Sequence, residues 1–356
     1  MRGNMRRRSV RARGLRAGCT LAGFLALAGP ATAQTEPTAA EQLFIYSLNR
    51  ARHDPPAWAQ EFGLGSMQGG DGNPTTLVGV APRPPLAVND YLVSSARGHA
   101  QEMAQSNYFA HQSAVDGRWP NKMARDAGYP LPQSIPATGG GSWLFPDGDN
   151  QTNGNGIESI AAGFGPGDFD YSNPINALNG LFVDEGTPDL GHRVHLLAIT
   201  EPNDFFREIG AGYGFSSKAD YENYWSAQTG VIHESDTFLT GVVYADANGN
   251  HLYDLGEGIG GATVNVSGMP VLTNAAGGWA APVASGTHGV TCSGGSFAGT
   301  AVVNVDVSGA SREVDCVSGF AGAYVDFAQV PEPGAVAAAL AALSAVRALA
   351  ARRRRA

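Results

Sequence analysis

The residues of this sequence that could carry chemistry are two histidines and two acidic side chains in its central part. They are His111, Glu158, Glu185 and His192, with Asp184 as the alternative to Glu185. Imidazoles and carboxylates that converge can bind a divalent ion such as zinc, or can act as general acids and bases. The alternative is a buried network in which these groups satisfy one another by hydrogen bonds and bind nothing.

A long segment, residues 86–111, must position the first of these groups. Its apolar side chains recur at spacings of three and four, which predicts an amphipathic helix with one buried stripe. We expect Asp90 to cap the start of this helix and His111 to follow its end in a loop. His99 lies beside the stripe, and His195 follows the second candidate histidine by three residues, so both are interpreted as packing residues.

The remaining elements of the central region, residues 38–236, have helices first and strands mostly last. This order predicts an α+β domain built in layers and not a repeat of βαβ units. A partly apolar segment carries Glu158, and a long polar loop rich in glycine and proline precedes it. Helices are expected over residues 39–53, 120–128 and 174–182, and strands over 208–215 and 224–232.

The region from 238 to 328 has a different pattern, with short alternating runs separated by glycine-rich turns. Period-two alternation with regular turns predicts a small all-β sandwich domain. Cys292 and Cys316 are the pair of cysteines left once Cys19 is removed with the N-terminal segment. In an oxidising compartment we expect this pair to form a disulfide.

Between the first two runs of this last region, oxygen-bearing side chains follow the spacing of a calcium loop. In such loops, positions 1, 3, 5, 9 and 12 supply side chains and position 7 supplies a main-chain carbonyl. His251 replaces the glycine that usually occupies position 6, and a metal-free turn rich in asparagine and glycine is the alternative. The candidate ligands are Asp246, Asn248, Asn250, Leu252, Asp254 and Glu257.

Both ends of the chain are typical of addressing signals. Arginines, an apolar run and the small residues 31–33 predict a secretory signal peptide over residues 1–33. Residues 330–356 place Pro-Glu-Pro before an apolar helix and an arginine cluster, and this tail resembles the PEP-CTERM sorting signals of Gram-negative bacteria. The resemblance implies transient membrane association, cleavage by an exosortase-type enzyme, and release to the cell surface or matrix. A permanent membrane anchor is the alternative.

Five segments of the central region, taken in order, resemble the bacterial branch of the CAP superfamily, whose domain is also called SCP-like. They are NYFAH, GIESIAAG, LGHRVHLL, EIGAGYGF and YWSAQTG, within roughly residues 40–235. The resemblance implies an α-β-α sandwich with a cleft that holds two histidines and two acids. Carried over by motif, these are His111, Glu158, Glu185 and His192, although Ser159 stands where the family often has asparagine.

A second resemblance covers the last region. FLTGVVYADANGNHLYDLGEGIGGATVNV, followed by TNAAGGWAAPV, is similar to the calcium-binding B-type repeats of bacterial surface proteins and to related prealbumin-like modules. This resemblance favours calcium in the loop that begins at Asp246.

Together these patterns predict an exported cell-surface or extracellular-matrix protein whose cleft binds a ligand or a divalent metal. The alternative is a metal-dependent hydrolase, in which His111 and His192 hold zinc and an acid, Glu158 or Glu185, acts as base on a bound water. The sequence has no G-x-S-x-G motif, and its central region has no cysteine. The net charge of −9 argues against a nucleic-acid partner. The expected partners are a ligand or matrix component and the exosortase-type processing enzyme.

Overall fold

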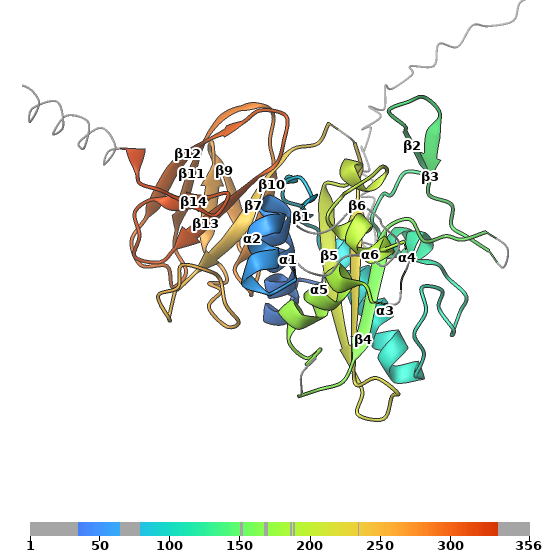
Figure 1. Ribbon diagram of the computed structural model, residues 1–356. Coiled ribbons are helices and arrows are strands. Elements are labelled where there is room, and N and C mark those ends of the chain that lie inside the picture. The colour runs from blue at the N-terminus through green and yellow to red at the C-terminus, as the bar shows by residue number, and fades with distance from the viewer. Residues whose placement is uncertain are drawn as a thin grey trace, which may run out of the picture. The chain divides into compact units, whose positions relative to one another are not determined.

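A computed structural model describes residues 35–64, 79–149, 152–166, 170–185, 187, 189–233 and 235–333. The predicted signal peptide and most of the predicted sorting tail lie outside these ranges. Every helix within them is either too short or too polar to span a bilayer. Helices and strands occur together in the central region (Figure 1), which confirms the α+β prediction.

A four-stranded sheet is the framework of the central region. Its strands are β1 (Ala87–Val88), β4 (Glu158–Gly163), β5 (Glu208–Phe215) and β6 (Asn223–Gly230). The order is β1-β5-β6-β4, with β1 parallel to β5 and the other neighbours antiparallel. β5 and β6 form a hairpin, and Glu158 at the start of β4 lies opposite Gln228 of β6.

Helix α3 (Asp90–Ser106) packs directly on one face of this sheet (Figure 1). Gly210, Gly212 and Gly214 alternate along β5 and point at the helix. A Cβ atom added to any of them would lie only 2.0 to 2.3 Å from a main-chain atom of the helix. This is shorter than any van der Waals contact, so no larger residue fits. The glycines of EIGAGYGF therefore determine how closely α3 approaches the strands. They also determine the distance between the polar side chains of α3 and those of the sheet.

The helix begins one residue before the predicted start, at Asp90 itself, and Ala87–Val88 at the beginning of the segment pair with β5 as a short strand. Asn89 caps the helix in place of Asp90: its Oδ1 accepts hydrogen bonds from the main-chain N–H groups of Tyr91 and Leu92, at 3.0 and 3.3 Å. Asn107 ends the helix in the left-handed conformation with φ of 52°. The predicted stripe is buried throughout; it consists of Leu92, Val93, Ala96, Ala100, Met103 and Ala104.

Helices α1 (Ala39–His53) and α5 (Pro174–Val183) cover the opposite face of the sheet. Phe44 of α1 stacks on Trp225 of β6 with ring centroids 5.3 Å apart, and the apolar side chains of α5 belong to the same buried cluster. Thr38 caps α1 in a capping box with Glu41. The central region is thus layered as helix, sheet and helix.

Shorter elements complete the central region. They are α2 (Pro55–Glu61), α4 (Pro120–Asp126), α6 (Gly191–Leu196), the 3₁₀ turn η2 (Asn203–Phe205), and the hairpin of β2 (Ser134–Pro136) and β3 (Ser142–Leu144). Helix α2 was not among the helices expected from the sequence. Asp54 caps this second helix, which begins at Pro55, where proline is well accommodated.

The last region forms two further sheets. One has the order β10-β7-β13-β14-β15 and the other β12-β11-β8-β9. The alternating valines of the strands meet in one buried cluster with Trp279, and a disulfide between Cys292 of β11 and Cys316 of β13 joins the two sheets. The strands are β7 (Phe238–Tyr244), β8 (Thr263–Val266), β9 (Met269–Leu272), β10 (Gly278–Pro282), β11 (Gly286–Ser293), β12 (Ala301–Val307), β13 (Arg312–Val317), β14 (Ala323–Val325) and β15 (Ala328–Val330).

Helix α1 also contacts this last region. Leu43 and Tyr46 share a buried cluster with Val242 and aromatic residues of the last region, and Asn49 Nδ2 donates to Glu313 Oε2 at 3.0 Å. Residues on both sides of the sequence boundary near 237 therefore bury side chains against each other.

Candidate functional site

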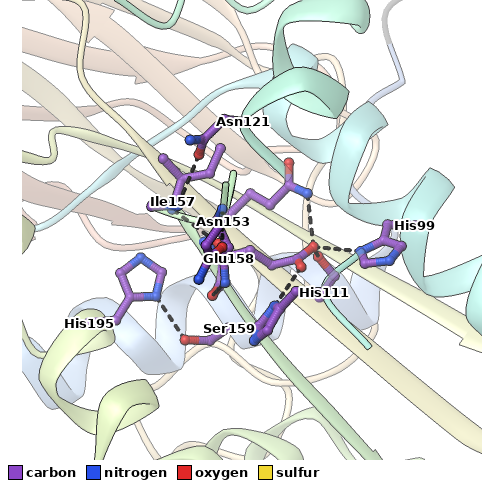
Figure 2. Close-up of polar contacts among 12 residues, drawn as sticks. His99, His111, Asn121, Asn153, Ile157, Glu158, Ser159 and His195 are labelled. Carbon is purple, nitrogen blue, oxygen red and sulfur yellow. Dashed lines mark hydrogen bonds and ion pairs between the residues drawn. The ribbon is translucent and has the colours of Figure 1, made fainter. Parts of the chain in front are cut away.

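The carboxylate of Glu158 is the centre of the polar groups between α3 and the sheet (Figure 2). It is buried and accepts hydrogen bonds from four side chains. Nδ1 of His99 lies 2.8 Å from Oε1 and Nδ1 of His111 lies 3.0 Å from Oε2. Ser226 Oγ and Gln228 Nε2 both donate to Oε1, at 2.7 and 3.0 Å.

The two imidazoles decide the charge of this carboxylate. Burial raises the pKa of Glu158, but the charges and hydrogen bonds of His99 and His111 together outweigh burial and hold it well below its usual range. At His99 burial lowers the pKa, and Glu158 outweighs it, so the pKa of His99 is raised. Glu158 is therefore ionised at neutral pH although no solvent reaches its side chain.

The loop that carries His111 is held by a second acid of α3. Glu102, one turn after His99, accepts hydrogen bonds from Tyr108 Oη and from Ser113 Oγ, the latter at 2.6 Å. These two anchors flank His111 on either side in the chain. Because both end on the same carboxylate oxygen, the loop is fixed against the helix and the imidazole is aimed at Glu158.

The second histidine of the site, His192, is in α6 and is held in the same manner as the first. Its Nδ1 lies 2.7 Å from Oδ1 of Asp184, and its main-chain N–H donates to Oδ2 at 2.9 Å. Burial raises the pKa of Asp184, and the hydrogen bond and charge of His192 outweigh it, so this pKa is lowered. Of the two acids that the sequence left open, the structure places Asp184 against the histidine. Glu185 is exposed, and among the described residues no hydrogen bond or ion pair joins it to His192 or His111.

The two imidazoles lie next to each other. The ring centroids of His111 and His192 are 6.2 Å apart, and their side chains are 31% and 25% exposed. In each ring Nδ1 is engaged by a buried carboxylate, whereas no described residue hydrogen-bonds to Nε2. Proteins commonly prepare histidine ligands in this way, because the carboxylate fixes the ring and leaves Nε2 unprotonated for a metal.

These residues fit a divalent ion held by two imidazoles. No three or more His, Cys, Asp or Glu side chains in the described ranges are grouped so as to hold one ion. Glu158 and Asp184 are committed to orienting the rings, so they supply no further ligand. An ion between His111 and His192 would leave coordination positions for water or for a bound molecule.

The other two histidines differ in role. His195 is buried, with Ser159 Oγ 2.8 Å from its Nδ1 (Figure 2) and Thr229 Oγ1 2.6 Å from its Nε2. Burial, helped by the nearby His192, lowers the pKa of His195 to about 3, so this ring is neutral. His99 is buried too, but the interpretation as a packing residue missed its contact with Glu158. Its three-residue spacing from Glu102 puts both polar side chains on one side of α3, which indicates a polar side of the helix but not the partner of His99.

The predicted calcium loop forms a ring of local hydrogen bonds. Asp246 accepts from the main-chain N–H groups of Gly249 and His251, at 2.8 and 3.1 Å. Asn248 and Asn250 both contact Oδ2 of Asp254 at 2.7 Å, and Glu257 accepts from the N–H groups of Ala247 and Asp254. His251, at the position that glycine usually takes, has φ of 64°, so the backbone adopts the turn that glycine would favour.

Comparisons with known proteins add little to this geometry. No protein-family model matches the chain, and no curated protein matches it either. Among solved structures, the chain is similar to an extracellular protein containing an SCP domain from Bacillus anthracis, with 22% sequence identity over 42% of this chain and a TM-score of 0.26. The match covers 34% of that protein, so this chain spans about a third of its length. So weak a similarity carries no argument about function.

Proposed function

We propose that this chain is an exported CAP-domain protein that binds a divalent metal ion, such as zinc, or a ligand between His111 and His192. The observation that supports this most is the pairing of each imidazole with its own buried carboxylate. Two adjacent rings with engaged Nδ1 atoms and available Nε2 atoms are costly to build and unnecessary for packing. The order of the motifs around Glu158 and the helix-sheet-helix layers support the CAP assignment.

Binding is favoured over hydrolysis by the surroundings of the acids. A general base must reach the water that it activates, but the side chain of Glu158 is fully buried and accepts four hydrogen bonds. Asp184 is engaged by His192, and no hydrogen bond or ion pair within the described part of the chain links Glu185 to either histidine. The metal-dependent hydrolase therefore lacks an accessible carboxylate base, and the binding function is the one that we put forward.

The rest of the chain supports display outside the cell. We propose that residues 1–33 direct export and that the tail from 330 holds the protein at the membrane until an exosortase-type enzyme releases it. In this proposal the loop from Asp246 to Glu257 binds calcium and stiffens the last region. Chelation would then lower the melting temperature of the last region, and an unchanged calorimetric transition in EDTA would contradict the calcium site.

Metal analysis of the purified protein tests the central proposal. Wild type and the variants His111→Ala, His192→Ala and Glu185→Gln are dialysed against zinc, and bound metal is measured by mass spectrometry and by calorimetric titration. We expect about one zinc per chain in wild type and in Glu185→Gln, and a loss of at least tenfold in affinity in each histidine variant. Equal zinc in all four proteins would exclude the site.

A further inference from the structure

A cluster of exposed aromatic rings lies at the other end of β4 from Glu158. Phe109 is 44% exposed, Tyr221 38% and Phe164 61%. The rings of Phe109 and Phe164 each lie against Tyr221, with centroids 5.9 and 5.8 Å away. We call these three residues the aromatic patch. Phe164 follows Glu158 by six residues of extended chain, roughly 20 Å along the strand, whereas Phe109 lies two residues before His111.

Buried residues and main-chain hydrogen bonds support the segments that carry Phe164 and Tyr221. Alternation along β4 puts Phe164 on the same face as Ile160, which shares a buried cluster with Tyr224. The Tyr221 main-chain N–H donates to Tyr224 Oη at 3.3 Å. The turn from 216 to 222 is tied to the end of α3, because the Asp220 N–H donates to Asn107 Oδ1 at 2.6 Å. The patch is therefore a preformed surface, and a contiguous exposed apolar patch is typical of a contact site.

Two acids and one base lie in the turn beside the aromatic patch. Asp220 and Glu222 flank Tyr221 in the chain, and Lys218 is exposed three residues before Tyr221. Glu222 Oε2 lies next to Gly165, only 3.0 Å from where a Cβ of that residue would be, and so beside Phe164. Among the described residues, no basic side chain forms an ion pair with Asp220 or Glu222. Carboxylates without a cation beside exposed aromatic faces attract ammonium and guanidinium groups, through charge and through the ring quadrupole.

We infer that the aromatic patch, with Glu222 at its side, is a docking surface for a basic polypeptide segment. Lysine or arginine side chains of the partner would lie on the faces of Phe164 and Tyr221 while Glu222 neutralises their charge. The residues of this surface differ from those of the histidine pair, although Phe109 lies two residues before His111 in the same loop.

The chain offers a matched control for the rings. Phe215 is 57% exposed, but it precedes the same turn on the opposite face of the sheet, since its neighbour Gly214 faces α3. Phe215→Ser removes as much exposed aromatic surface as Phe164→Ser without touching the aromatic patch.

The test measures binding of a fluorescein-labelled octapeptide of alternating lysine and glycine to the exported protein, by anisotropy at low and high salt. We expect wild type to bind, Phe164→Ser to weaken binding about fivefold, and Glu222→Gln to weaken it about threefold at low salt only. Phe215→Ser should bind as wild type. Circular dichroism and thermal unfolding verify that each variant is folded.

Three outcomes would overturn the inference. One is the absence of binding to wild type, and another is equal binding of the peptide after its lysines are acetylated, which would leave only apolar contact. The third is tighter binding of a neutral oligosaccharide or of anionic lipid vesicles with the same dependence on Phe164. Because the peptide assay contains no metal, its failure would leave the proposed zinc site untouched.

Discussion

Two sets of acidic side chains in this molecule are equally buried, but their pKa values are shifted in opposite directions. Glu158 lies between two imidazoles, and its pKa is held well below its usual range despite burial. Glu313 and Asp315, on β13 next to α1, accept only from neutral donors, the Asn49 amide and the Val242 N–H. Burial raises the pKa of Asp315 to about 8, and burial together with Asp315 raises that of Glu313 well above its usual value.

The difference shows that burial alone does not decide the charge of an acid. Where imidazoles face the carboxylate, the buried group stays ionised and can hold the rings in one orientation. Where only amides face it, the group is protonated and acts as a neutral hydrogen-bonding side chain. The first arrangement prepares histidines for a ligand, and the second joins α1 to β13 without a buried charge.

The largest effect should follow from removing the buried charge of the site. Glu158→Ala leaves His99, Ser226 and Gln228 buried without their acceptor, and we expect a loss of about 4 kcal/mol in the free energy of unfolding at pH 7. Urea denaturation measures it. Glu158→Gln keeps the shape and one acceptor oxygen, and should lose less. A loss below about 1 kcal/mol in Glu158→Ala would mean that the network contributes little to stability.

Much of this architecture could be predicted from the sequence, because helices and strands leave periodic patterns in neighbouring residues. The stripe of α3 repeats with the period of a helix, and the period-two runs after 237 alternate as strands do. The contact of His99 with Glu158 could not be read, because it depends on how α3 lies across β4, and the two residues are 59 apart in the chain. The choice between neighbouring acids depended on one backbone conformation: Asp184 takes φ of 55°, which turns its side chain toward His192.

The second prediction concerns the uncharged acids. In the folded protein the pKa of Asp315 is raised to about 8, so folding retains a proton that the unfolded chain releases near pH 4. Stability must therefore fall as pH rises from about 4 to 8. Asp315→Asn removes this loss and keeps the acceptor for Val242, and we expect it to be more stable than wild type by about 2 kcal/mol at pH 8.

Thermal and urea unfolding from pH 4 to pH 9 measure the difference between the two proteins. Asp306→Asn, at an exposed position of β12, is the control. Its free energy of unfolding should change with pH in the same way as that of wild type. A difference that stays constant with pH would show that Asp315 is ionised in the folded protein, and the comparison with Glu158 would fail.

A third prediction tests whether Glu102 affects zinc binding by orienting His111 or affects only the stability of the fold. Glu102→Gln weakens both anchors of the loop, because a neutral amide is a poorer acceptor for Tyr108 and Ser113. We expect zinc affinity to fall about fivefold, equal to about 1 kcal/mol. Tyr108→Phe removes one anchor and should have about half this effect. A fall in unfolding free energy without a change in zinc affinity would leave Glu102 a purely structural residue.

The smallest effect is expected from the pH dependence of His99. Its pKa is raised in the folded protein above the usual 6.5, so its contribution to stability is complete below that pH and is lost as pH rises through the folded value. The gain is limited, because His99 Nε2 is buried without a hydrogen-bond partner among the described residues. Between pH 6 and pH 9, wild type should lose about 1 kcal/mol more than His99→Gln. Equal slopes in the two proteins would mean that the protonation of His99 does not change on folding.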